Sequence, residues 1–165
     1  IDGGWAPART VMANESAFIG RGGASTGEKL IELARLHGRR DDPVIRQRLA
    51  DFHARERLLG LMGETIQQAV RRGEYPPIDG ALIKLYAADL KVRGGDLAME
   101  LCGPAALVDV DPEARWSRAE LINRFGISIG GGTNEVQRNN LGERALGLPR
   151  EPRVDKDVAW KDVPK

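Results

Sequence analysis

Two patterns in the chain contain residue types that could bind a phosphate or a metal ion, and neither pattern is complete. Gly22 and Gly27 have the glycine spacing of a phosphate-binding loop, but Glu28 follows where that loop needs lysine, and no strand precedes it. His37 and His53 have no acidic or thiol partner at a spacing typical of zinc ligands. We therefore expect neither a nucleotide-binding loop nor a metal site here.

A glycine turn that leads into a charged helix is the most distinctive pattern in the chain. Residues 129–146 read Ile-Gly-Gly-Gly-Thr-Asn-Glu-Val-Gln-Arg-Asn-Asn-Leu-Gly-Glu-Arg-Ala-Leu, and Gly-Leu-Pro-Arg-Glu-Pro follows over residues 147–152. This pattern resembles the C-terminal end of the acyl-CoA dehydrogenases, in which the segment passes beside the flavin. The family positions are matched by Gly130, Gly131, Gly132, Thr133, Gln137 and Arg138.

The resemblance implies an all-α fold, a four-helix up-and-down bundle with long helices, a short extra helix and an extended tail. The bundle is expected over residues 1–148 and the tail over 149–165. An N-terminal helical domain and a middle β-domain precede this part in complete members, and they are absent from this chain. The resemblance further implies FAD as cofactor, an acyl-CoA substrate from fatty-acid or other lipid degradation, and a dimer or tetramer. The isolated domain is expected to be inactive.

Glu15 is the residue that the resemblance identifies as the catalytic base. Many members of the family carry their catalytic glutamate immediately before the Gly-Thr pair, where this chain has Gly131. A minority place it on the first helix of this domain, which is the position of Glu15. Ser16 replaces the arginine that commonly follows. The alternative is that Glu15 only complements the positive end of its helix.

The implied reaction needs a carboxylate and a flavin on either side of the same two carbons. The base removes the α-proton of the acyl-CoA while the β-hydrogen leaves as hydride to the flavin N5. A carboxylate with the ordinary glutamate pKa of about 4.3 is a weak base for this proton, and a dry site raises that pKa. We therefore expect desolvation by bound substrate to be part of the mechanism.

The resemblance also assigns residues that hold the flavin. Arg39 and Gln47 match an arginine and a glutamine near the start of the second helix, which contact the flavin pyrophosphate of the neighbouring subunit. The third helix of the family ends in Gln-x-x-Gly-Gly toward the adenine half, whereas residues 100–104 of this chain keep Gly103 and have Glu100 in place of the glutamine. The contacts implied at the glycine turn are Gly132, Thr133 and Glu135.

The amino-acid composition of the chain agrees with a helical domain. The 165 residues are 41% hydrophobic and 30% charged, and only 5% are aromatic, which favours packed helices over a sheet sandwich. The 25 basic and 24 acidic residues give a formal net charge of +1, so no nucleic-acid or membrane partner is expected. Cys102 stands alone in an apolar stretch, and we expect a buried, inert thiol and a reducing cytoplasm.

Periodicity predicts two antiparallel helices of about thirty residues each. The first begins with Asp42 as cap and Pro43 in the first turn, and it closes at Gly73 in a left-handed conformation. The second stops at Gly103-Pro104. Their expected apolar stripes are Ile45, Leu49, Phe52, Leu59, Met62, Ile66 and Val70, and then Ile78, Leu82, Leu85, Leu97 and Leu101. Upstream, a helix is expected over 5–36, and downstream helices over 112–125 and 133–146 flank a turn at 126–132.

Two other functions are compatible with the same residues. The chain could be the non-catalytic subunit of a heteromeric acyl-CoA dehydrogenase, because Gly131, Ser16 and Glu100 all depart from the common pattern. It could also be a purely structural helical oligomerisation module without a flavin.

Overall fold

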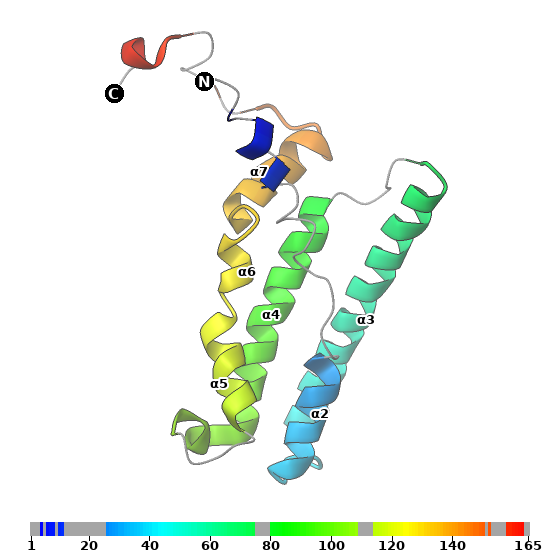
Figure 1. Cartoon of the computed structure of the whole chain (residues 1–165). Helices are drawn as coiled ribbons and strands as arrows, with labels where there is room; N and C mark the ends of the chain where they lie inside the picture. The colour runs from blue at the N-terminus through cyan, green and yellow to red at the C-terminus, as the bar shows by residue number, and fades with distance from the viewer. Residues whose placement is uncertain are drawn as a thin grey trace.

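The structure, a computed structural model, is helical throughout the part of the chain that it describes (Figure 1). The all-α prediction is therefore confirmed. The four-helix up-and-down arrangement stays a prediction, because much of the expected first helix, together with Glu15, lies outside the described residues. The described residues are 4, 6–8, 10–11, 26–74, 80–108, 114–150, 152 and 158–163.

Helix α3 is the best-defined element, and its two ends match the sequence prediction. It spans Pro43–Arg71, 29 residues, and the carboxylate of Asp42 accepts hydrogen bonds from the backbone N–H groups of Val44 and Ile45. Gly73, just past the helix, has a φ of +70°. The cap, the proline at the first turn and the left-handed glycine are all confirmed.

Helix α4 is the centre of the fold, and the other helices pack around it (Figure 1). It runs antiparallel to α3 over Gly80–Cys102, 23 described residues, and residues 75–79 before it lie outside the described residues. The helices beside α4 are α2 (Thr26–Leu36), α3, α5 (Ala114–Asn123), α6 (Gly126–Ile129) and α7 (Asn134–Arg144), and the 3-10 helix η1 (Gly103–Leu107) follows it directly.

A pair of glycines lets two neighbours approach α4 from opposite sides. A Cβ atom on Gly94 would lie 3.1 Å from the ring of Phe52 on α3, and one on Gly95 would lie 3.1 Å from the backbone oxygen of Glu120 on α5. Larger side chains at either position would separate the helices. The small size of Gly94 and Gly95 therefore lets α3 and α5 pack closely against α4 at the same level.

The hydrophobic core gathers where α2, the first half of α3, the second half of α4, η1 and α5 meet. Cys102 is buried there, as predicted, and its sulfur lies 3.1 Å from the hydroxyl of Ser117. No residue of α6 or α7 is buried. The buried core residues are Leu30, Leu33, Ala34, Ile45, Phe52, Leu90, Leu97, Ala98, Leu101, Cys102, Ala106 and Ala114.

Several predicted details are wrong. Val70 and Leu82 of the expected apolar stripes are 59% and 39% exposed. Ala69, next to Val70, is 1% exposed, so the side of α3 that carries Ala69 packs inward at this end of the helix and the side that carries Val70 does not. Gly126–Ile129 forms the short helix α6 where a turn was expected, so the turn begins only at Gly130. In the expected extended tail, Trp160–Asp162 forms the 3-10 helix η2.

The prediction for residues 5–36 is confirmed in part. Ala6–Ala8, Thr10 and Val11 are helical, α2 covers Thr26–Leu36, and residues 12–25 between them lie outside the described residues. The expected helix over 112–125 is present as α5. No described helix is long and apolar enough to cross a membrane.

Candidate functional site

The glycine turn has a backbone conformation that residues other than glycine rarely adopt. Gly131 and Gly132 have φ values of +65° and +89°. The turn ends at Thr133, whose hydroxyl oxygen accepts a hydrogen bond from the backbone N–H of Val136 and so caps α7, as predicted. The turn therefore presents bare backbone next to the start of a helix.

Gln137 fixes the turn from the α7 side. Its side-chain amide donates a 2.8 Å hydrogen bond to the carbonyl oxygen of Gly131. A Cβ atom on Gly132 would lie 2.9 Å from that same amide nitrogen. The positive φ therefore requires glycine at position 132, and a Cβ atom there would also displace the amide of Gln137.

A buried lysine fixes the turn from the α4 side. Lys84 is 6% exposed, and its ammonium donates a 3.0 Å hydrogen bond to the side-chain oxygen of Asn134, the first residue of α7. Burial lowers the pKa of Lys84, and the nearby charge of Glu135 opposes this shift. Lys84 was not foreseen from the sequence, although its spacing from the buried Ala81 and Ala88 puts it on the buried face of α4.

Glu135 carries its negative charge at the positive end of α7. The backbone N–H of Glu135 itself and the hydroxyl of Thr133 hold the pKa of this carboxyl below its ordinary value. Arg138, one turn along, pairs with Glu135 at 3.2 Å. Glu135 is therefore an exposed, ionised group beside the turn.

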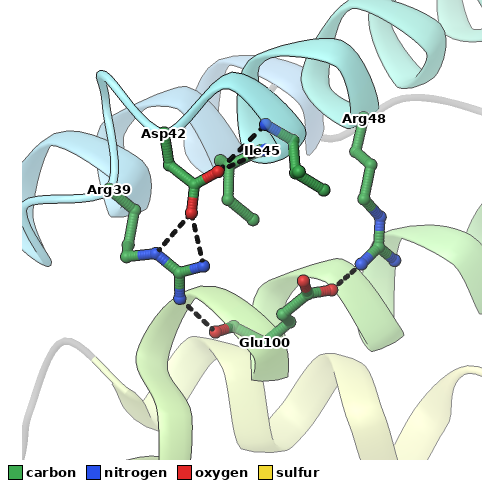
Figure 2. A network of polar contacts seen from close by, with 6 residues as sticks. Arg39, Asp42, Ile45, Arg48 and Glu100 are labelled. Atoms are coloured by element: carbon green, nitrogen blue, oxygen red, sulfur yellow. Dashed lines mark hydrogen bonds and ion pairs between the residues drawn. The ribbon is translucent and has the colours of Figure 1, made fainter.

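At the opposite end of α4, Arg39 joins three elements. Figure 2 shows its guanidinium donating two hydrogen bonds to the carboxylate of Asp42, at 2.9 and 3.3 Å, and a third at 3.4 Å to the backbone oxygen of Glu100. Arg39 also holds the pKa of Asp42 below its ordinary value, helped by the N–H groups of Ile45 and Val44. These contacts tie the loop between α2 and α3 to the end of α4.

Glu100 makes a second link across the same helices, because its carboxylate pairs with Arg48 of α3 (Figure 2). This pair was not foreseen from the sequence. Gln47 lies beside it and lines a cavity of about 480 Å³ between α3 and α4. The other lining residues are Arg48, Asp51, Phe52, Arg93, Asp96 and Leu97.

The structure gathers the predicted flavin contacts into two groups. Gly132, Thr133 and Glu135 lie together at the glycine turn. Arg39, Gln47 and Gly103 lie near the C-terminal end of α4, where Gly103 has a φ of +65°. Lys84 and Glu100 mark the two ends, which are about 24 Å apart at the helical rise of about 1.5 Å per residue.

Several observations bear on the predicted chemistry. Glu15, the predicted base, lies outside the described residues. Gly131 cannot supply a carboxylate from the turn, since it has no side chain. No cluster of three or more metal-ligating side chains occurs among the residues that the structure describes.

Taken together, these features define a helical domain whose glycine turn opens onto a helix N-terminus, and comparisons with known proteins identify its family. The family model described as acyl-CoA dehydrogenase, C-terminal domain, matches residues 2–146. The chain therefore belongs to the acyl-CoA dehydrogenase family and corresponds to the C-terminal domain of such an enzyme.

Individual relatives agree with this assignment. Acyl-CoA dehydrogenase IpdE1 of Mycolicibacterium smegmatis is 37% identical over 123 residues, which is 74% of this chain and 30% of the relative. Acyl-CoA dehydrogenase FadE26 of Mycobacterium tuberculosis is 35% identical over 124 residues, which is 68% of this chain and 30% of the relative. A solved variant of the Tcur3481-Tcur3483 steroid ACAD superposes with a TM-score of 0.62 at 26% identity, over 76% of this chain and 34% of that one. The chain thus spans about a third of the length of these relatives.

Proposed function

We propose that this chain is the C-terminal domain of a working FAD-dependent acyl-CoA dehydrogenase, which removes hydrogen from the α and β carbons of an acyl-CoA thioester. The observation that carries the proposal is the glycine turn. Gly131 and Gly132 expose backbone through positive φ values, and Gln137 holds them in place. A Cβ atom on Gly132 would meet the side-chain amide of Gln137 at 2.9 Å, so the turn stays bare of side chains where we propose that a flat ring system lies against its backbone.

A bound flavin would supply the acceptor for the β-hydrogen, which leaves as hydride, while residues of the chain would position the reactants and move the proton. Thr133 and the N–H groups at the start of α7 are the groups that would hold the flavin at the turn. Glu15 takes the α-proton, since Gly131 has no carboxylate to offer. Desolvation of this base by bound substrate would raise its pKa toward a useful value.

The group at the other end of α4 is proposed to serve a second subunit. Arg39, Gln47 and Gly103 would contact the pyrophosphate and adenine half of the flavin bound by a neighbour, while the glycine turn serves the flavin of its own subunit. The separation of about 24 Å between the two groups, estimated from the rise of an α-helix, supports this division. The protein is accordingly proposed to be a dimer or tetramer.

The test of the base is the Glu15→Gln variant of the full-length protein. We expect this variant to keep its bound flavin and to lose reduction of that flavin by acyl-CoA. Glu64→Gln is a matched control, because Glu64 is exposed on α3 and its ion pair with Arg57, at 4.0 Å, is loose. Unchanged reduction in Glu15→Gln would remove Glu15 as the base.

A second candidate function is the non-catalytic subunit of a heteromeric enzyme, and the pair between Glu100 and Arg48 favours it. A glutamine at position 100 could donate a hydrogen bond to the adenine half, whereas a carboxylate can only accept one, and here it is paired with Arg48. The name of the structural relative joins two proteins, Tcur3481 and Tcur3483, which also supports a heteromer. Normal flavin reduction by Glu15→Gln, with the base on another chain, is the result that this alternative predicts.

The substrate class is proposed from the same relative, whose name describes a steroid ACAD. We propose steroid-derived acyl-CoA thioesters as the first substrates to test, with straight-chain fatty acyl-CoA for comparison. Faster flavin reduction by the straight-chain thioester would overturn this assignment. The cytoplasmic location expected from the single cysteine stays a prediction.

A further inference from the structure

Lys84 is a charged side chain in a place where an apolar one would cost less. It lies on the buried face of α4 and is 6% exposed. Transfer of an ammonium group out of water is unfavourable unless strong partners compensate, and the lowered pKa of Lys84 reflects this desolvation. Methionine, which is also long and unbranched, would fill the same space without the penalty. Stability therefore does not explain the lysine.

The contacts of Lys84 indicate what it does. An ammonium group has three N–H donors, and within the described ranges its hydrogen-bond partner is the side-chain oxygen of Asn134, at 3.0 Å. Asn134 directly follows Thr133 and the two glycines with positive φ. The hydrogen bond therefore connects the most buried helix to the first residue after the turn.

Within the contact that α7 makes along α4, this link is the hydrogen bond that joins the start of α7 to α4. None of its residues is buried, and Val136, near its start, is 50% exposed. Figure 1 shows α6 and α7 lying along α4 as a single outer row. Gln137 fixes the turn to α7, but it cannot fix α7 to the rest of the molecule. The bond from Lys84 to Asn134 makes that connection between α4 and the start of α7.

We propose that Lys84 is a positioning residue, which holds the glycine turn in the correct position and orientation for the flavin through its hydrogen bond to Asn134. This inference rests on the proposed function, since it assumes that a flavin lies against the turn. Its role is indirect, because the lysine acts through Asn134 and the backbone of residues 131–133.

The test compares lysine variants of the full-length protein at saturating FAD. In Lys84→Met we expect an altered visible circular dichroism spectrum of the bound flavin and about tenfold weaker FAD binding, because displacements of about 1 Å in a site can cost as much as 100-fold. The melting temperature without added FAD should be no lower than that of the wild type, since a desolvated charge has been removed. A purely structural lysine would instead lower the melting temperature and leave the spectrum of the loaded protein unchanged.

Lys91→Met is the matched control. Lys91 lies on the same helix and pairs with Glu120 of α5, away from the turn. We expect this variant to melt earlier and to keep the wild-type flavin spectrum and FAD affinity. A flavin change of equal size in Lys91→Met would overturn the inference.

Variants of Asn134 keep the proposal testable even if Lys84→Met fails to fold. Asn134→Ala should reproduce the spectral change, and Asn134→Asp should retain the wild-type spectrum, because a carboxylate also accepts the bond from Lys84. Wild-type spectra and affinities in both Lys84→Met and Asn134→Ala would overturn the inference while leaving the proposed function intact. A colourless wild-type protein that cannot be reconstituted with FAD would overturn both this inference and the proposed function.

Discussion

At the scale of single residues, the backbone of Gly132 decides what the glycine turn can accept. We expect Gly132→Ala to lose flavin, because a Cβ atom there would meet the amide of Gln137 at 2.9 Å in a backbone with φ of +89°. Gly147→Ala is the control, since Gly147 has a φ of +66° and open space around it. Both variants should lose about 1–2 kcal/mol from the left-handed conformation.

Flavin retention after gel filtration of the full-length protein measures the difference between these variants. Gly147→Ala should stay yellow and Gly132→Ala should not. Equal retention in the two variants would show that the contact with Gln137 does not shape the flavin site.

Asp42 contributes to the folding stability of the protein, and the size of this contribution depends on pH. Arg39 and two backbone N–H groups hold its pKa below the ordinary value of 3.8, so the unfolded chain binds this proton more tightly than the folded one. The contribution is therefore complete above about pH 5 and is lost as pH falls through the lowered folded pKa. An asparagine at this position could still cap α3 but would bind Arg39 without a charge.

The corresponding measurement is the melting temperature of the wild type and of Asp42→Asn between neutral pH and about pH 2, because the contribution of a carboxylate with a lowered pKa is lost only below about pH 5. We expect the wild type to be more stable near neutrality and the difference to shrink as the solution becomes acidic. A difference that stays constant over the whole range would contradict the role of the Asp42 charge.

At this scale, the sequence predicted the helix caps, but it did not predict which side chains are buried by distant parts of the chain. Asp42 and Thr133 follow local rules, because their oxygens bond to N–H groups two or three residues away. Lys84 follows no such rule, since its partner lies fifty residues further along the chain. Its spacing from Ala81 and Ala88 places it on the buried face of α4, but its hydrogen bond to Asn134 depends on the packing of α7 against α4.

At the scale of helices, some glycines lie where a side chain would clash with a neighbouring helix, and others have open space around them. Gly95→Val should destabilise the domain by about 1–3 kcal/mol through overpacking against the backbone of Glu120. Gly60 lies in the interior of α3 with nothing within 4 Å, so Gly60→Ala should stabilise it by up to about 1 kcal/mol.

Thermal melting of the two variants beside the wild-type protein provides the comparison. Opposite shifts are expected. A stabilised Gly95→Val would show that α4 and α5 do not approach each other as closely as 3.1 Å implies.

Helix prediction succeeded where ends and periodicity agreed and failed where tertiary neighbours decide. The bounds of α3 followed from Asp42, Pro43 and Gly73, because each has a strong local preference. Val70 has the right spacing for the apolar stripe but is exposed, because the side of α3 that carries the adjacent Ala69 is the one that packs inward there. The short helix α6 was missed because Gly126 has low helix propensity on its own.

At the scale of the whole molecule, the two groups of predicted flavin contacts lie too far apart to form one small site. The row formed by α6 and α7 also has no buried residue; Phe125, just before α6, is 49% exposed, and Ile129, the last residue of α6, is 69% exposed. Contiguous exposed apolar surface of this kind can mark a site where another domain or subunit packs.

We therefore predict that the isolated 165-residue chain binds FAD at least about tenfold more weakly than the full-length protein, a loss of about 1.4 kcal/mol or more in binding free energy. Titration of each protein with FAD, followed by flavin fluorescence, measures the ratio. Equal affinities would mean that the glycine turn needs neither a second domain nor a second subunit.

The most direct test of the proposed function mixes the full-length protein with an acyl-CoA thioester in the absence of oxygen and follows the flavin absorbance. We predict a yellow protein whose flavin band bleaches on mixing. A protein without flavin, or a flavin that stays oxidised with every thioester tried, would contradict the proposed function.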